Sequence, residues 1–174
     1  MSQLLDEMEE CVPALRRYAR ALTHDRDRAD DLVQDCLERA IRKRGLWRPS
    51  GSVRSWLFRI LLNIHRNDLR QLRRAPLPLS LDALPDSDPA GPDAQPNSAL
   101  TGRLALAETA RAMQALPPEQ REVLLLVAVE EMSYAEAAAV LSIPAGTLMS
   151  RLARARAALR DLTQAEPPKL RSVK

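Results

Sequence analysis

Two stretches of the chain concentrate arginine, the side chain best suited to binding phosphate or the edge of a base. Residues 52–74 hold six arginines against one acid, and residues 147–160 hold four arginines and no acid. A guanidinium presents a planar fork of N–H donors that pairs with phosphate or with guanine. A face built from ion pairs four residues apart would need more acids than this. The imbalance favours an anionic partner, and the alternative is a basic face exposed to water.

The second arginine stretch follows a predicted break between two helices. Ser133 and Glu136 have the spacing of a capping box, so we expect a helix over 133–141. Pro144 is best tolerated where a helix starts, which places a turn at 142–144. The expected small-residue face of the first helix is Ala135, Ala138, Ala139 and Leu141, and the expected inner face of the second is Leu148, Leu152, Ala155 and Leu159.

A short helix, a tight turn and a longer basic helix form the helix-turn-helix layout, whose second helix enters the major groove by its N-terminal half. The candidate contacts to base edges or phosphates are Thr147, Met149, Ser150, Arg151 and Arg154. The alternative is an ordinary helical hairpin with a solvated basic face.

The first arginine stretch is predicted to be one long helix over 52–74. Its expected buried stripe is Val53, Trp56, Leu57, Ile60, Leu61, Ile64 and Leu72, and its candidate nucleic-acid contacts are Arg54, Arg59, Asn63, Arg66 and Asn67. The preceding loop, 45–51, displays Trp47 and Arg48. A tryptophan beside an arginine can stack on unpaired bases, and the alternative is that Trp47 packs on the domain edge.

Two further helices are expected before that loop, over 4–22 and 29–43, joined by a polar connection at 24–28. Pro13 either kinks the first helix or marks its true start. The second helix exposes Asp31, Gln34 and Asp35. This acidic side is either a solvated face or a docking face for a basic partner.

The composition indicates an all-α protein in two small helical domains joined by a flexible linker. Aromatic residues make up 3% of the 174 residues, and only 5 glycines occur. Residues 75–97 hold six of the 13 prolines, four acids and no base, which is typical of a linker that cannot fold alone. We expect domains at 1–74 and 98–164, with 165–174 as a mobile tail.

Several classes of protein are disfavoured. No apolar run approaches the roughly 20 residues of a membrane span, and the acidic N-terminus lacks the layout of a signal peptide, so a cytoplasmic protein without membrane insertion is expected. Cys11 and Cys36 carry no CxxC spacing, and His24 and His65 stand without a metal-ligand pattern. No phosphate-cradling glycine loop or nucleophile motif occurs, so we expect neither an enzyme nor a cofactor.

The order of these motifs resembles the extracytoplasmic-function (ECF) group of bacterial RNA polymerase sigma factors. RADDLVQDCLERAIRK resembles the core-polymerase-binding helix of that group, and WRPSGSVRSWLFRILLNIHRNDLRQLRR resembles its melting loop and minus-ten helix. Residues 116–159 resemble its minus-thirty-five-reading domain. The segments DRDRADDLVQ and LPPEQRE are most similar to the general-stress-response branch.

The resemblance implies roles by position. Core RNA polymerase would be bound by Asp31, Leu32, Gln34 and Asp35. The unpaired minus-ten strand would be held by Trp47, Arg48, Ser50, Ser52, Arg54, Arg59, Asn63, Arg66 and Asn67. The minus-thirty-five duplex would be read by the groove residues from Thr147 to Arg154. An anti-sigma factor that masks both domains is the further partner implied.

Two positions depart from the group, which usually has a basic residue at Met149 and a glycine at Ser142. The first departure removes one contact, and the second requires a left-handed serine or another turn geometry. Two rival functions are a stand-alone helix-turn-helix regulator and a sigma-like decoy that titrates an anti-sigma protein. The regulator would leave the first domain without a role, and the decoy would not need the DNA-facing arginines.

Overall fold

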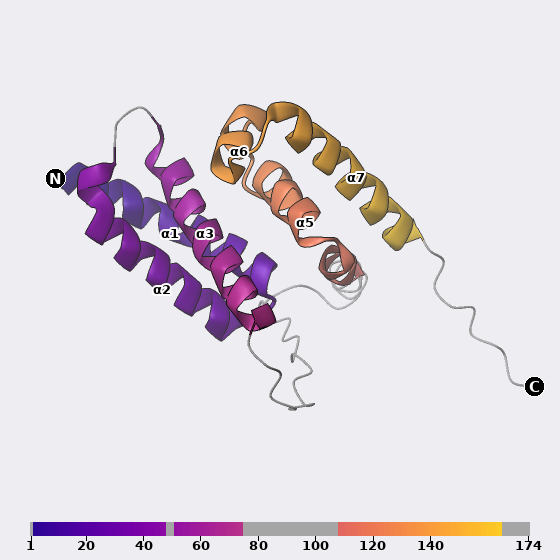
Figure 1. Cartoon of the computed structure of the whole chain (residues 1–174), viewed down its shortest axis with the longest axis horizontal. Helices are drawn as coiled ribbons and strands as arrows, with labels where there is room; N and C mark the ends of the chain where they lie inside the picture. The colour runs from indigo at the N-terminus through magenta and orange to yellow at the C-terminus, as the bar shows by residue number, and fades with distance from the viewer. Residues whose placement is uncertain (1, 48–50, 75–107, 165–174) are drawn as a thin grey trace, which may run out of the picture.

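The computed structural model describes residues 2–47, 51–74 and 108–164, and every regular element within these ranges is helical (Figure 1). The predicted linker at 75–97, the predicted tail at 165–174 and the predicted helix start near Ser98 lie outside the described residues. None of the described helices has an apolar stretch long enough to span a bilayer.

The first unit is a three-helix bundle of α1 (Ser2–Thr23), α2 (Arg26–Lys43) and α3 (Val53–Arg74), with a short 3-10 turn at Arg44–Leu46. α1 runs through Pro13 and begins at Ser2, so Pro13 does not mark its start. α2 begins three residues earlier than predicted, because the Asp25 side chain accepts a hydrogen bond from the backbone N–H of Arg28 and caps the helix. The predicted polar connection is therefore shorter than 24–28.

The second unit contains a helical segment at 108–115, α5 (Pro118–Leu124), a π-helical turn (η2, Leu125–Val129), α6 (Tyr134–Leu141) and α7 (Ala145–Gln164). In the wide η2 turn the Glu130 N–H donates to the Leu125 carbonyl over 3.0 Å. Glu131, with φ 52°, then reverses the chain towards α6.

The helix-turn-helix is confirmed in detail. Ser133 and Glu136 form the predicted capping box at the start of α6. Ser142 adopts the left-handed conformation, with φ 56° and ψ 44°, in which its N–H closes the end of α6. Leu148, Leu152 and Ala155 form the buried side of α7, as predicted.

Two predicted faces are wrong in part. The buried residues of α6 are Ala137, Ala138, Val140 and Leu141. Ala135 and Ala139 are exposed, because α6 packs against both α3 and α7 and those two neighbours set its buried arc. Leu72 is 58% exposed, and every residue of the last turn of α3, 71–74, is exposed with it.

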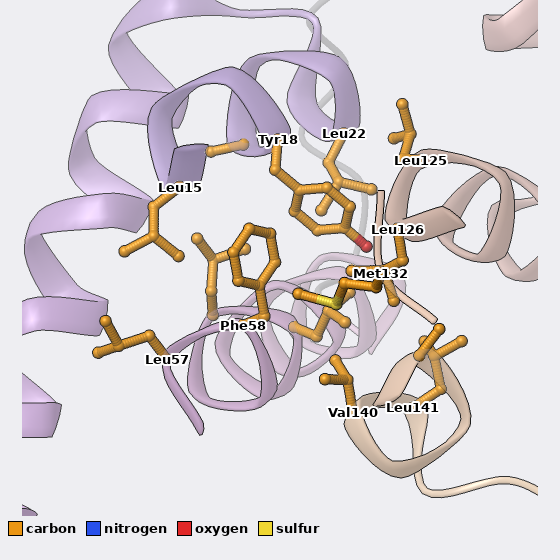
Figure 2. Close-up of a cluster of buried hydrophobic side chains, with 14 of the residues drawn as sticks. Leu15, Tyr18, Leu22, Leu57, Phe58, Leu125, Leu126, Met132, Val140 and Leu141 are labelled. Carbon is orange, nitrogen blue, oxygen red and sulfur yellow. The ribbon is translucent and has the colours of Figure 1, made fainter. Parts of the chain in front are cut away.

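The two units share one continuous core. Tyr18 and Phe58 of the first unit pack edge to face, with ring centroids 5.1 Å apart. Figure 2 shows these rings beside Leu126, Met132 and Val140 of the second unit. The first unit therefore presents apolar as well as basic groups to the second.

Candidate nucleic-acid interface

Three surfaces carry the predicted functional residues. We call them the α2 acidic face (Asp31, Gln34, Asp35), the α3 arginine face (Arg54, Arg59, Arg66) and the α7 groove face (Thr147, Met149, Ser150, Arg151, Arg154). The structure separates them by what each one contacts. The first and third are largely open to solvent, whereas the second lies at the junction between the units.

The α2 acidic face is exposed along its length. Gln34 donates to Glu38, one turn further along, over 3.2 Å. Leu32, predicted with this face, is 5% exposed and belongs to the core of the bundle. The face available to a partner is therefore polar, and Leu32 supports it from inside.

The loop before α3 is only partly described, because Arg48 and Ser50 lie outside the described residues. Trp47 is half-buried against the core, and its buried indole N–H has no hydrogen-bond partner in the described structure. Trp47 therefore packs on the domain edge, the second of the two predicted alternatives. The hydroxyl of Ser52 accepts a hydrogen bond from the Ser55 N–H over 3.1 Å, so Ser52 supports the first turn of α3.

Arg54, the first residue of the α3 arginine face, binds the Glu130 carboxylate, which α1 also contacts. The Glu130 side chain is 0% exposed. Arg54 Nη2 donates to its Oε2 over 2.9 Å and to its carbonyl over 2.7 Å. Arg17 of α1 approaches the same carboxylate with both ends of its fork, over 3.0 and 2.8 Å. Glu130, from the second unit, thus binds α1 and α3 together.

A second buried acid, Glu122 of α5, contacts α3 closer to its C-terminus. Arg66 donates to both of its carboxylate oxygens, over 3.2 and 2.5 Å. This hydrogen-bonded pairing raises the pKa of Arg66 above its ordinary value. Tyr18 donates from its hydroxyl to the Glu122 carbonyl over 3.4 Å, and burial raises the pKa of that phenol well above its usual range.

The remaining residues of the α3 face differ in their surroundings. Arg59 Nη2 donates to the Ala139 carbonyl of α6 over 2.6 Å. Asn63 and Asn67 are exposed on α3. The Arg54 guanidinium also lies 5.6 Å from the centre of the Phe58 ring, a cation–π contact that orients it towards the second unit. In this arrangement the α3 arginines are not the free surface that the sequence predicts.

The α7 groove face is accessible. Arg154 is exposed, Met149 is 51% exposed, and the Ser150 hydroxyl donates to the Thr147 carbonyl over 3.0 Å. Arg151 pairs with Glu119 of α5 over 2.6 Å, within the same unit. The glutamate is on the surface, so this pair is easily exchanged for a phosphate.

Sequence reasoning missed the roles of Arg17, Glu122 and Glu130. A signal was present, because Glu122, Leu126 and Glu130 recur every four residues and Leu126 is fully buried. An acid on the buried stripe of a helix requires a cationic partner. The partners come from the other unit, however, and the sequence does not reveal that packing.

Two models of known protein families match separate parts of the chain. Residues 8–62 match the model of the Sigma2 domain of PhyR, and residues 106–159 match that of Sigma-70, region 4. The chain is 38% identical over 159 residues to "ECF RNA polymerase sigma factor EcfG" of Rhodopseudomonas palustris, covering 91% of this chain and 84% of the relative. It is 35% identical to "RNA polymerase sigma factor CnrH" of Cupriavidus metallidurans, covering 90% and 84%.

Solved structures show the same fold. The sigma factor RpoE in complex with the anti-sigma factor NepR, from Bartonella quintana, aligns with a TM-score of 0.73 at 27% identity, covering 96% of this chain and 100% of that one. CnrH in complex with the cytosolic domain of CnrY aligns with a TM-score of 0.69 at 31% identity, covering 94% and 89%. The anti-anti-sigma factor PhyR of Bartonella quintana, at 16% identity and a TM-score of 0.60, shares the fold.

Proposed function

The chain belongs to the ECF family of RNA polymerase sigma factors, and we propose that its three surfaces divide the work of promoter recognition. The observation that carries this proposal is the 38% identity to a sigma factor over 91% of the chain. A sigma factor binds core RNA polymerase and directs it to promoter DNA, so it works in the cytoplasm with the polymerase and performs no catalysis itself.

The α2 acidic face is proposed to bind the core polymerase. Asp31, Gln34 and Asp35 are exposed on one side of a well-packed helix, so a basic partner helix can reach them without rearrangement of the bundle. Charged residues of this kind steer association and fix register.

The two arginine surfaces are proposed to bind DNA. The residues proposed to hold the minus-ten strand are Arg48, Ser50, Ser52, Arg54, Arg59, Asn63, Arg66 and Asn67. The α7 groove face is proposed to read the minus-thirty-five duplex, with Arg151 and Arg154 as its cations. The division into domains at 1–74 and 98–164, joined by 75–97 and followed by the tail 165–174, belongs to the same proposal.

An anti-sigma factor is the proposed restraint. RpoE and CnrH, two structural neighbours, were each solved with such a protein or its cytosolic domain bound. We propose that a related partner restrains this chain by masking both of its units.

The decisive experiment is promoter-directed transcription with purified core polymerase. The sigma function predicts new specific transcripts whose starts can be sequenced. A stand-alone regulator would bind duplex DNA without polymerase and yield no transcript.

A sigma-like decoy is the second candidate, and the match of residues 8–62 to the Sigma2 domain of PhyR favours it. A decoy would bind an anti-sigma protein and support no transcription. The α3 and α7 arginines favour the sigma factor over the decoy, because a decoy has no DNA to neutralise.

Asp31→Arg tests the docking face. We expect it to weaken binding to core polymerase at least about tenfold, because a like charge would meet a basic partner. Asp161→Arg is the control, since Asp161 is exposed at the far end of α7 and undergoes the same change of charge. Affinity is measured by titrating labelled protein with core polymerase, and equal affinity of the two variants would remove the assignment.

A further inference from the structure

The arginines proposed to hold the minus-ten strand already have an occupant in this structure, and it is the other half of the chain. Glu130 binds Arg54, Glu122 binds Arg66, and the Ala139 carbonyl binds Arg59. The three acceptors come from η2, α5 and α6. No DNA-facing arginine of α7 is engaged across the same junction within the described residues.

We propose that Glu122 and Glu130 act as an internal substitute for DNA phosphates and hold the protein in a closed state that cannot bind the minus-ten strand. The inference rests on the proposed function of α3. In this state the second unit is the competitor of the single strand, and the competition is for the same guanidinium groups.

The geometry of the contacts carries the comparison with phosphate. Arg66 and Arg17 each approach a carboxylate with Nε and Nη2, which is the two-pronged pairing that a guanidinium offers to a phosphate. Arg66 thereby commits the Nε and Nη2 edge of its guanidinium, the edge that would make the same two-pronged contact with a phosphate of the strand. The α3 arginines therefore cannot bind the two acids and the minus-ten strand at the same time.

The burial of the acids shows that the contact is specific. Both glutamate side chains are nearly inaccessible, at 0% for Glu130 and 4% for Glu122, while their arginine partners keep between 28% and 53% exposure. A carboxylate removed from water to this extent is stable only if its partners stay in place. Without the arginines the buried acids would have no partner, whereas the arginines would still be hydrated without the acids.

Apolar packing seals the junction around these pairs. Phe58 and Tyr18 lie against residues of the second unit, with Leu126, Met132 and Val140 beside them (Figure 2). Opening the units exposes this surface to water, so the closed state is the resting form of the free chain. Polymerase or DNA must supply the free energy that separates the units. The apparent affinity for DNA is the affinity of the open form multiplied by the fraction of molecules that are open.

The test removes the acids and leaves every arginine intact. The double variant Glu122→Gln with Glu130→Gln is compared with Glu108→Gln with Glu131→Gln, since Glu108 and Glu131 are exposed glutamates of the same unit and Glu119 pairs with Arg151. Both variants gain the same charge, but only the first loses the contacts to α1 and α3. Two readouts are taken from the free protein: its radius of gyration by X-ray scattering, and its affinity for a short fluorescent single-stranded DNA of mixed sequence.

We expect the first variant to have the larger radius and to bind the strand about three- to tenfold more tightly than the control, as the open fraction rises. Equal affinity of the two variants overturns the proposal, whether or not the radius changes. A gain shared by both variants is a general charge effect and overturns it as well. If the double variant loses its helical circular dichroism, Glu122→Gln alone is judged against Glu131→Gln by the same two readouts.

Transcription by the unmodified chain with core polymerase decides the proposed function separately. If the unmodified chain gives specific transcripts but the Glu122→Gln, Glu130→Gln variant binds single-stranded DNA no more tightly than its control, the sigma function stands and the proposed internal competition is wrong.

Discussion

The two helices proposed to contact DNA hold their arginines in opposite ways. Arg54 and Arg66 of α3 bind buried acids of the other unit, whereas Arg151 of α7 binds a surface acid of its own unit. The α7 groove face is therefore the same whether the units are packed or apart. The α3 arginine face exists as a free surface only after separation. Under the proposed roles, the closed protein can read the minus-thirty-five duplex, whereas it can bind the minus-ten strand only after the units separate.

The largest expected effect comes from removing both cations that contact Glu130. The double variant Arg17→Ala with Arg54→Ala leaves a buried carboxylate unpaired, and breaking such a contact costs about 3–5 kcal/mol. Urea denaturation followed by circular dichroism should show a much lower midpoint than the parent. Arg151→Ala is the control, because its pair with Glu119 is partly solvated. Equal midpoints for the two variants would contradict the comparison.

Arg151→Ala sharpens the comparison from the other side. Loss of this cation should weaken binding of the minus-thirty-five duplex by about 1–3 kcal/mol. Its effect on the free energy of unfolding should stay below about 1 kcal/mol, since the pair with Glu119 is at the surface. Promoter strength and duplex affinity are measured beside the denaturation curve. Unchanged promoter strength would count against the assignment of the α7 groove face.

The turn between α6 and α7 offers a smaller change that acts within the second unit alone. Ser142 adopts φ 56°, a conformation that costs a residue with a side chain about 1–2 kcal/mol and costs glycine far less. Ser142→Gly should stabilise the protein by up to about 1 kcal/mol after the greater chain entropy of glycine is subtracted. The melting temperature reports the gain, and the radius of gyration should not change. A lower melting temperature would mean that the Ser142 side chain stabilises the turn by more than its left-handed backbone costs.

The smallest effect concerns pH and the cap of α6. Hydrogen bonds from the Ser133 hydroxyl and N–H to the Glu136 carboxylate hold the pKa of Glu136 below its usual 4.5. A depressed folded-state pKa means that the cap stabilises the protein fully above the unfolded-state pKa and is lost as pH falls through the folded-state value. The stability difference between the parent and Glu136→Gln should therefore shrink as the pH is lowered through about 4. A difference that stays constant over that range would show that the charge of Glu136 is not involved.

Local features of the structure were predictable from the sequence because neighbouring residues determine them. The capping box of Ser133 and Glu136 and the left-handed Ser142 depend only on residues three or four positions away. The start of α2 was missed although Asp25 offers a standard N-cap. Trp47 was left between two alternatives, since the residues that half-bury it come from distant parts of the chain.

The arrangement of the α3 arginine face could not be predicted in the same way. An excess of arginine over acid along one helix indicates an anionic partner. Within this structure the arginines bind two glutamates more than fifty residues away, and these acids flank an apolar run, 123–129, that is typical of a core segment. Sequence spacing carries no information on which helices meet across a junction between two units.

The sharing of Glu130 between α1 and α3 has a consequence for how the protein would respond to a signal. Because one enclosed carboxylate ties two helices at once, releasing either guanidinium alone leaves the remaining contact to bear the whole cost of desolvation. Intermediate, half-parted molecules are therefore scarce. Each molecule should therefore be either closed or open, and a rising dose of polymerase or inhibitor should shift the fraction in each state smoothly, with no half-open species at any dose.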